Sequence, residues 1–446
     1  MEKIARILDR IVEIAIYSLV FIIPFSKAGI EIFATIAIIA WVIAGLLRCF
    51  TPRNDVFVPS WPNPLPKRVE GIIRFFPQTP LNKPILALFA LSFISMITSV
   101  NINLSMEGVF FKLAEYVLIF FICAGIFSRK KAGDKKLMIL AGVILASVIL
   151  LFTDAVFQWI TCRDFIRGFK AIVRLTACFS NTNDFAGYII VILPILFCLI
   201  FFEFIKEKKI LRRIIKFGSA VLFLLGFILL ATTFSRGAWL GYLISMLFMG
   251  IIGLLTNKKQ QKIFAILTIV FVCATLIGGL LSARSIRKRF IGMTTGVEAA
   301  GNRLHQWKEA MSIIEDFPVL GTGPNTYTTV ASHYKTTIAT GSYPHNSYLQ
   351  MVAEIGLLGF GAFLWVLWRF FHTGIRLVFA KGGVTSVGRF VHNDEFLLMG
   401  IMAGVLATLA QSFFDTNLFA LRLATMFWIM LGIGTGRMAI LSQEKN

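Results

Sequence analysis

Long apolar stretches, separated by short polar and basic segments, run through the whole chain. The stretches are continuous rather than alternating between apolar and polar residues, which is typical of membrane-spanning helices and not of transmembrane strands. At about 20 residues per span they predict about twelve transmembrane helices. The predicted spans are residues 11–25, 29–47, 84–100, 107–127, 137–159, 184–202, 217–233, 237–255, 263–281, 346–368, 395–413 and 421–440. The pattern therefore predicts an all-α, polytopic membrane protein with a single integral membrane domain over residues 1–446.

The composition supports this interpretation. Of the 446 residues, 57% are hydrophobic and 15% are charged. Soluble domains contain roughly 45–50% apolar and about 25% charged residues. The composition thus excludes an ordinary soluble enzyme and a disordered protein.

The net charge of +21 fits a membrane protein as well. In a soluble protein this excess would suggest nucleic acid as a partner. In this chain the basic residues cluster between apolar stretches, at 129–136, 206–216 and 258–262, as the positive-inside rule predicts. We therefore expect membrane lipids, not nucleic acid, as partners, and both termini in the cytoplasm.

Two segments on the opposite side, 160–183 and 282–345, carry Lys and Arg where the rule disfavours them. Either these segments bind an anionic ligand, or they are loops that were translocated to this side regardless of their charge because they are long. The longer one lies between the ninth and tenth spans. We expect it to contain an amphipathic helix over about 303–316 that begins after Asn302 as N-cap and ends before Pro318. The apolar residues of this helix recur at helical spacing: Leu304, Trp307, Met311 and Ile314.

The six cysteines show neither a CxxC motif nor zinc-ligand spacing. Cys162 and Cys178 share the first of the two outer segments. In an oxidising compartment a disulfide between them would close a loop of about 15 residues and contribute about 3 kcal/mol. The sequence leaves open whether they pair.

Several catalytic motifs are missing from the chain. It contains no Walker motif, no HExxH and no GxSxG, and no dense cluster of acidic residues suggests a tight metal site. An ATP-driven pump and a metalloprotease are therefore disfavoured, and we expect no metal and no cofactor.

The notable polar residues lie at the outer ends of spans. Arg236, in TTFSRGAW, lies between two adjacent spans, where its guanidinium group either snorkels to water or binds a phosphate bidentately. Arg303 begins the expected loop helix. His345, in SYPHNSY, begins a span, and is either a structural hydrogen-bonding residue or a base for a hydroxyl acceptor.

Two further ionisable positions fall inside spans. Glu354 lies nine residues after His345, and an ionisable residue at this depth is expected to face a cavity or a partner. Lys112 and Glu115 are separated by three positions and most simply pair with each other.

The segment HNSYLQMVAEIGLLGFG resembles the signature of the O-antigen ligase family. His345 and Asn346 are followed by nine residues and then by a GxxGxG pattern from Gly356 to Gly361, in which Phe360 replaces the usual Thr. The segments GNRLHQWKEA, PVLGTGPNTY and TTFSRGAWLGY are also similar to this family. The resemblance covers roughly residues 180–440.

The resemblance implies a twelve-span glycosyltransferase of the GT-C type in the bacterial inner membrane, with a periplasmic active site. Such an enzyme moves a glycan from an undecaprenyl-diphosphate carrier to a hydroxyl of lipid A–core, without a metal and with inversion. By the same resemblance Arg236 and Arg303 bind the diphosphate and His345 activates the acceptor. The candidate supporting residues are Asn346, Glu354, Arg163 and Arg174.

Alternatives remain open at the level of the sequence. Within the superfamily, the chain is a ligase, an O-antigen polymerase or a protein O-oligosaccharyltransferase. Outside it, a twelve-span lipid or glycan transporter or a non-enzymatic scaffold would have a similar hydropathy profile. Convergence of Arg236, Arg303 and His345 at one outer site would count against a scaffold.

Overall fold

The computed structural model describes residues 1–49, 76–128, 130–170, 174–201, 209–255, 295–334, 343–380 and 388–445, together with a few single residues between 262 and 273. Within these ranges the regular structure is helical, and the β-type pairing is one isolated antiparallel bridge between Arg163 and Lys170. The prediction of an all-α chain is confirmed for this part of the protein.

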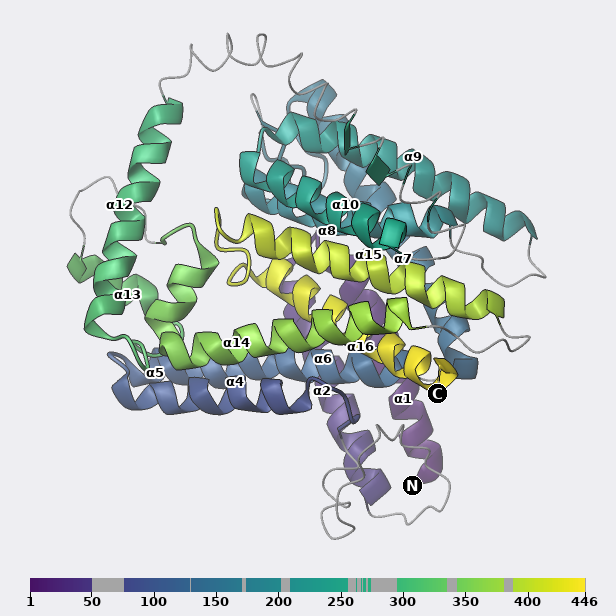
Figure 1. Ribbon diagram of the computed structural model, residues 1–446, viewed down its shortest axis with the longest axis horizontal. Helices are drawn as coiled ribbons and strands as arrows, with labels where there is room; N and C mark the ends of the chain where they lie inside the picture. Colours follow the sequence, from purple (N-terminus) through teal and green to yellow (C-terminus); the bar gives the residue numbers. More distant parts are fainter. Residues whose placement is uncertain are drawn as a thin grey trace.

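The long helices run through the molecule at varied tilts (Figure 1). Their bounds are α1 Glu2–Ile22, α2 Lys27–Cys49, α4 Asn82–Ile94, α6 Ala114–Phe127, α7 Lys130–Thr161, α8 Thr182–Phe201, α9 Lys209–Thr233, α10 Arg236–Leu255, α12 Thr295–Asp316, α14 Ser347–Phe379, α15 Gly388–Gln411 and α16 Leu421–Lys445. The short elements are the 3₁₀ helix η2 Ser95–Thr98, α5 Ile102–Met106, the π-helix η3 Glu107–Leu113 and α13 Tyr327–Tyr334.

Among the described residues, nine helices are long and apolar enough to cross a membrane. They are Lys27–Arg48, Ile102–Phe127, Lys135–Thr161, Thr182–Phe201, Ile210–Thr233, Arg236–Leu255, Ser347–Phe379, Asp394–Gln411 and Leu421–Gln443. Nine of the predicted spans coincide with these helices, which confirms that each is a long apolar helix. Of the other three, 11–25 lies mostly in α1, 84–100 overlaps the shorter apolar helix Asn82–Thr98, and 263–281 lies almost entirely outside the described residues.

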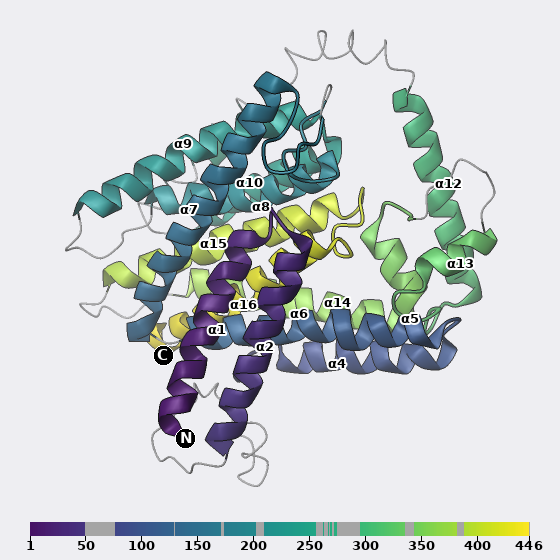
Figure 2. The ribbon, with the colours of Figure 1, turned by 180° about the vertical axis from the view of Figure 1, so that it is seen from behind.

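The helix α1 is amphipathic, and two of its acidic residues pair with neighbouring helices. Asp9 forms an ion pair with Arg48 of α2, and Glu13 lies 2.5 Å from the Lys136 ammonium group of α7. Figure 2 shows α1 and α2 as an antiparallel pair that extends toward the N-terminus. Paired charges let this helix pack beside apolar helices at a lower desolvation cost.

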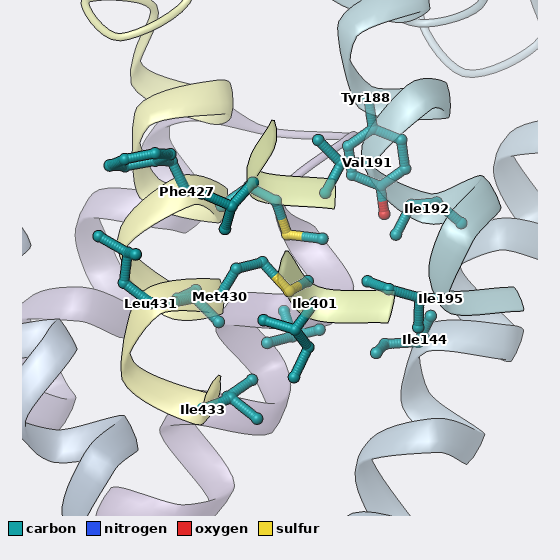
Figure 3. Close-up of a cluster of buried hydrophobic side chains, with 14 of the residues drawn as sticks. Ile144, Tyr188, Val191, Ile192, Ile195, Ile401, Phe427, Met430, Leu431 and Ile433 are labelled. Atoms are coloured by element: carbon teal, nitrogen blue, oxygen red, sulfur yellow. The ribbon is translucent and has the colours of Figure 1, made fainter. Parts of the chain in front are cut away.

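The centre of the bundle is formed by α8, α15 and α16, which are buried along most of their length. Apolar side chains of these helices and of α7 meet in one cluster (Figure 3). The labelled members of the cluster are Ile144, Tyr188, Val191, Ile192, Ile195, Ile401, Phe427, Met430, Leu431 and Ile433. The surrounding helices expose large apolar side chains, as expected of surfaces that face lipid tails.

The helices α12 and α13 pack against α14, and Figure 1 shows them at the edge of the molecule away from the C-terminus. The expected start of the α12 helix is wrong, because it begins at Thr295 and Asn302 therefore lies inside it instead of capping it. The expected apolar face is only partly right. Leu304 and Met311 are about half exposed, whereas the packed face contains Ala310 and Ile313.

The helix α14 is interrupted at Gly356, whose φ of 66° and ψ of −179° lie outside the helical region. The turn that follows α12 fills this interruption. Thr322 donates its N–H to the Ala353 carbonyl at 2.9 Å, and the N–H of Leu357 bonds to the Pro318 carbonyl at 2.9 Å. A Cβ atom at Gly356 would lie 2.1 Å from the carbonyl oxygen of Val319. The glycine of the motif is thus required for both its φ and its closeness to this turn.

We expect Gly356→Ala to lower the free energy of unfolding by at least about 2 kcal/mol, because the Cβ clashes with backbone and the positive φ adds strain. The matched control is Gly361→Ala, five residues later in the same helix, where a Cβ meets nothing within 4 Å. It should be neutral or slightly stabilising, since Ala is the better helix former. Thermal unfolding of both variants in detergent checks the pair, and equal melting temperatures would contradict the account.

Candidate active site

His345 lies two residues before the start of α14, next to the N-cap Asn346, and has a positive φ of 46°. The helix is capped by Asn346, whose side-chain oxygen accepts the N–H groups of Tyr348 at 2.9 Å and Leu349 at 3.1 Å. This cap satisfies two of the donors that a helix start leaves without partners. The candidate supporting residue Asn346 therefore acts on His345 by fixing the end of the helix next to it.

The connection between α15 and α16 holds His345 from a second direction. The imidazole Nδ1 lies 3.1 Å from Oδ1 of Asp415. The neighbouring Ser347 donates its N–H to the Ser412 carbonyl at 2.8 Å and its hydroxyl to the Asp415 carbonyl at 3.0 Å. The His345 side chain is 37% exposed and that of Asp415 only 7%, so the carboxylate is the buried member of the pair.

The ionisation of Asp415 suits this pairing. Burial alone would raise its pKa, but the hydrogen bond and charge of His345 and the N–H of Thr416 hold the pKa below its usual value. An ionised carboxylate accepts the proton on Nδ1 of a neutral imidazole, which leaves Nε2 as the unprotonated nitrogen. The arrangement orients a ring that can accept a proton at Nε2.

Arg174 is held beside this pair by the ends of two helices. Its Nε donates to the Thr233 carbonyl at the end of α9 at 2.8 Å, and its Nη2 donates to Oδ1 of Asn183 at the start of α8 at 3.2 Å. Asn183 also lies close enough to Asp415 to help lower the pKa of its carboxyl group. The amide side chain of Asn183 therefore lies between Arg174 and the His345–Asp415 pair.

Arg236 is the first residue of α10, directly after the tight turn in which Phe234 has a φ of 52°. The next residue, Gly237, packs against Phe414, and a Cβ at Gly237 would lie 3.0 Å from Cβ of Phe414. Because Phe414 precedes Asp415, this contact places the start of α10 against the α15–α16 connection.

The charges of Arg236 and Arg303 both act on Arg174. Burial lowers the pKa of the Arg174 guanidinium group, and the positive charges of Arg303 and Arg236 lower it further, while Asp415 opposes the shift. Three guanidinium groups thus share one region with a single acidic neighbour acting on Arg174. Such a concentration of positive charge stabilises an anionic ligand, above all one that binds guanidinium groups bidentately.

Arg163 does not take part in this arrangement. It lies at the end of α7, where its backbone N–H donates to the Thr161 hydroxyl at 3.3 Å. Within the described ranges, no contact joins Arg163 to Arg174, Arg236 or His345. The described contacts of Arg163 therefore give no support to its expected role at the site.

Glu354 has partners within the protein. Its carboxylate accepts the N–H of Asn325 at 2.9 Å, the N–H of Tyr327 at 3.3 Å and the side-chain amide of Gln350 at 3.1 Å. It is 4% exposed. Glu354 therefore fixes the turn after α12 to α14, and so supports the placement of the helix that carries Arg303.

The expected Lys112–Glu115 pair is wrong. Lys112 lies 3.3 Å from the Glu107 carboxylate and donates to Oδ1 of Asn325 at 2.9 Å. Glu107 precedes Lys112 by five positions, and both lie in the π-helix η3. In a π-helix the backbone hydrogen bonds join residues five positions apart, so such positions lie near each other along the helix. The rule for positions three apart assumes α-helical geometry and fails at this point.

Cys162 and Cys178 are both free thiols, so the disulfide that the sequence left open is not formed. Cys162 is exposed, whereas Cys178 is buried and its thiol donates to the Pro24 carbonyl at 3.1 Å. Burial raises the pKa of the Cys178 thiol to about 12, which disfavours the reactive thiolate.

Two residues of the site escaped the sequence analysis, Asp415 and Asn183. The available signal for Asp415 was the short polar run 415–417 between the last two predicted spans, in which Asp415 is the acidic residue. Asn183 carried no comparable signal, because asparagines are common at helix starts. Neither lies in the four motif segments that carry the resemblance, although both fall within the wider range that it covers.

The fold and the site define a multi-pass α-helical membrane protein with an arginine cluster and a histidine–aspartate pair at one end of the bundle. Residues 220–364 match the family described as O-Antigen ligase, which supports a relation of this chain to that family. The match contains Arg236, Arg303 and His345 but neither Arg174 nor Asp415. A comparison with curated proteins finds no match. The family consists of glycosyltransferase-like enzymes of the ligase and polymerase superfamily, whose partners are lipid-linked glycans and lipid acceptors.

Proposed function

We propose that the protein is an O-antigen ligase-like glycosyltransferase of the bacterial inner membrane. It moves a glycan from an undecaprenyl-diphosphate carrier to a hydroxyl of lipid A–core on the periplasmic face, with inversion and without a metal. The observation that carries the proposal is the convergence of Arg174, Arg236 and Arg303 with the His345–Asp415 pair at one end of the bundle.

The acceptor is activated by His345. Its Nε2 takes the proton of the acceptor hydroxyl while the oxygen attacks the anomeric carbon of the donor sugar. The resulting imidazolium is stabilised by the Asp415 carboxylate, 3.1 Å from Nδ1. A positioned base of this kind contributes typically 10²–10⁴-fold.

The leaving group is stabilised by the arginine residues. As the new glycosidic bond forms, the bond from the anomeric carbon to the diphosphate oxygen breaks, and negative charge develops on the undecaprenyl diphosphate. Arg174, Arg236 and Arg303 supply fixed positive charge for this oxygen, which is a function that Mg²⁺ serves in many other phosphate reactions. A single displacement of this type inverts the anomeric configuration.

The competing functions differ in what they require of these residues. A scaffold has no need for three mutually repelling guanidinium groups beside a histidine. A transporter commonly uses broken helices to bind its substrate, but the break in α14 is occupied by the protein's own turn, with Gly323 donating to the Glu354 carbonyl at 2.9 Å. The polymerase needs the same donor site, and differs only in the acceptor.

Sizing the products of a defined reaction tests the proposal. Purified protein is mixed with lipid-diphosphate-linked glycan and lipid A–core, and the products are separated by mass. One transfer to lipid A–core is expected. A ladder of lengthening glycans on the carrier lipid would assign the polymerase function, and transfer to neither acceptor would contradict a transferase.

Activity should survive EDTA. The arginine cluster supplies the charge that a divalent cation would otherwise supply, and in the described part of the chain no group of three His, Cys, Asp or Glu side chains is arranged to hold a metal ion. The measurement is the initial transfer rate before and after EDTA treatment. A loss that Mg²⁺ or Mn²⁺ restores would overturn the arginine-only account.

A further inference from the structure

A tight hairpin follows α7, and we call residues 161–170 the α7–α8 hairpin. Its centre is the buried Asp164, whose carboxylate accepts the N–H groups of Arg167 and Phe169, each at 2.5 Å. The Asp164 N–H in turn donates to the Phe169 carbonyl at 3.1 Å. Arg163 and Lys170 pair across the hairpin. Figure 2 shows this connection at the upper end of α7.

Two fully buried polar side chains of α7 hold the hairpin in place. Asp154 accepts the N–H of Phe165 at 2.9 Å and that of Ile166 at 3.3 Å. Gln158 donates to the Phe169 carbonyl at 3.3 Å. Polar side chains inside a membrane-spanning helix are costly and rarely idle. Because Asp154 and Gln158 hydrogen-bond to the backbone of the hairpin, they fix the hairpin relative to α7.

The hairpin presents three exposed cations: Arg163, Arg167 and Lys170. Its own carboxylate, Asp164, is 2% exposed and is committed to backbone N–H groups. Among the side chains that the structure describes, no acidic group forms an ion pair with any of the three cations. The surface is therefore strongly basic and uncompensated on the side of the bundle that carries the arginine cluster.

Exposed apolar side chains lie among these cations. Phe165 is 46% exposed and Phe169 41%, while Trp159 and Ile160 at the end of α7 are 55% and 77% exposed. The Arg167 guanidinium group lies 5.6 Å from the centre of the Phe169 ring. Aromatic residues concentrate at the depth of the lipid head groups, and cations beside them contact lipid phosphates.

We propose that the α7–α8 hairpin binds the phosphate head groups of anionic phospholipids in the leaflet on the side of the candidate active site. Its aromatic rings lie among the upper acyl chains, and Arg163, Arg167 and Lys170 contact the phosphates above them. This explains why Lys and Arg accumulate in the segment 160–183, where the positive-inside rule disfavours them. The proposal does not depend on the transferase reaction, because none of the three cations contacts the arginine cluster.

The exposed thiol of Cys162 lies within the hairpin and provides a local probe. The full chain with Cys49→Ser and Cys273→Ser is labelled at Cys162 with a fluorophore and reconstituted into phosphatidylcholine vesicles. Quenching is compared for phosphatidylglycerol and phosphatidylcholine that carry a nitroxide near the head group, at equal mole fractions. We expect the anionic lipid to quench at least about twofold more strongly, and added salt to reduce the difference.

The variant R163Q/R167Q/K170Q should abolish the difference. The matched control K3Q/R6Q/R10Q removes three exposed cations from α1 at the other end of the bundle and should retain it. Equal quenching by both lipids in the unmodified hairpin, or a preference that survives the hairpin variant, would overturn the proposal. So would displacement of phosphatidylglycerol by a small amount of lipid A–core, which would assign the surface to the glycolipid.

Discussion

Replacing His345 with alanine is expected to lower the turnover of glycan transfer roughly 10²–10⁴-fold, which is the usual contribution of a positioned general base. Binding of the lipid-linked donor should change little, because in the proposed mechanism the arginine residues hold the diphosphate. The variant should also remain folded. Asn346 caps α14, and the backbone N–H and hydroxyl of Ser347 bond to the α15–α16 connection, so neither depends on the imidazole. Turnover and donor affinity are measured separately on the purified protein.

The pH profile distinguishes a base from a positioning residue. A base must be unprotonated, so activity should rise with pH through the range in which imidazoles titrate, and this limb should vanish in His345→Ala. The variant His345→Gln keeps a donor and an acceptor but cannot take a proton near neutral pH. An active Gln variant with an unchanged profile would refute the general base.

The variant Asp415→Asn provides a second check on the same pair. Asp415 remains ionised at neutral pH because His345 holds its pKa below the usual value despite its burial. The neutral amide no longer stabilises the imidazolium ion, so the ascending limb should move to lower pH while the maximal rate falls. A rate and profile equal to those of the unmodified protein would mean that the pair is not used in catalysis.

Hydropathy was sufficient to predict most of the spans, because lipid requires continuous apolar helices and each such stretch is readable in isolation. The pairing of His345 with Asp415 was not readable in this way. The two residues lie 70 positions apart and meet only because α14 and the α15–α16 connection pack together. The hydrophobic periodicity of a sequence does not predict which helix ends lie next to each other in the fold.

The failures at helix ends have local causes. The first turn of a helix was placed at Asn302 because Asn is a good cap, yet the helical structure continues back to Thr295. The pairing of Lys112 with Glu115 assumed an α-helix in a segment that forms a π-helix. Both predictions used a rule that is correct for regular α-helices. The missing information was where the regular helix begins and ends.

For the glycines of the motif, the sequence pattern was recognised correctly, and the fold explains why glycine is required at these positions. Gly321 has a φ of 72°, and a Cβ there would lie 2.5 Å from the Glu354 carbonyl group. Gly356 approaches the same turn from the other side. The segments PVLGTGPNTY and HNSYLQMVAEIGLLGFG are therefore two halves of one packed structure. It fixes α12, which carries Arg303, against α14, which follows His345.

The arginine cluster should show a loss of function without a loss of stability. We expect Arg236→Ala and Arg303→Ala each to lower transfer roughly 10²–10³-fold, the usual cost of removing one group that stabilises charge in a transition state. Lysine at either position should rescue poorly, because an ammonium group cannot bind a phosphate bidentately. The control Arg213→Ala, at the other end of α9 from Thr233, should transfer at the unmodified rate.

The stability of the same variants separates a binding site from a structural one. The positive charges of Arg236 and Arg303 lower the pKa of Arg174, so each destabilises the charged form of its neighbour. Removing either Arg relieves this repulsion, and the melting temperature in detergent should stay unchanged or rise. A clear fall in the melting temperature would mean that these residues hold the fold together. Unmodified transfer in either alanine variant would remove that Arg from the site.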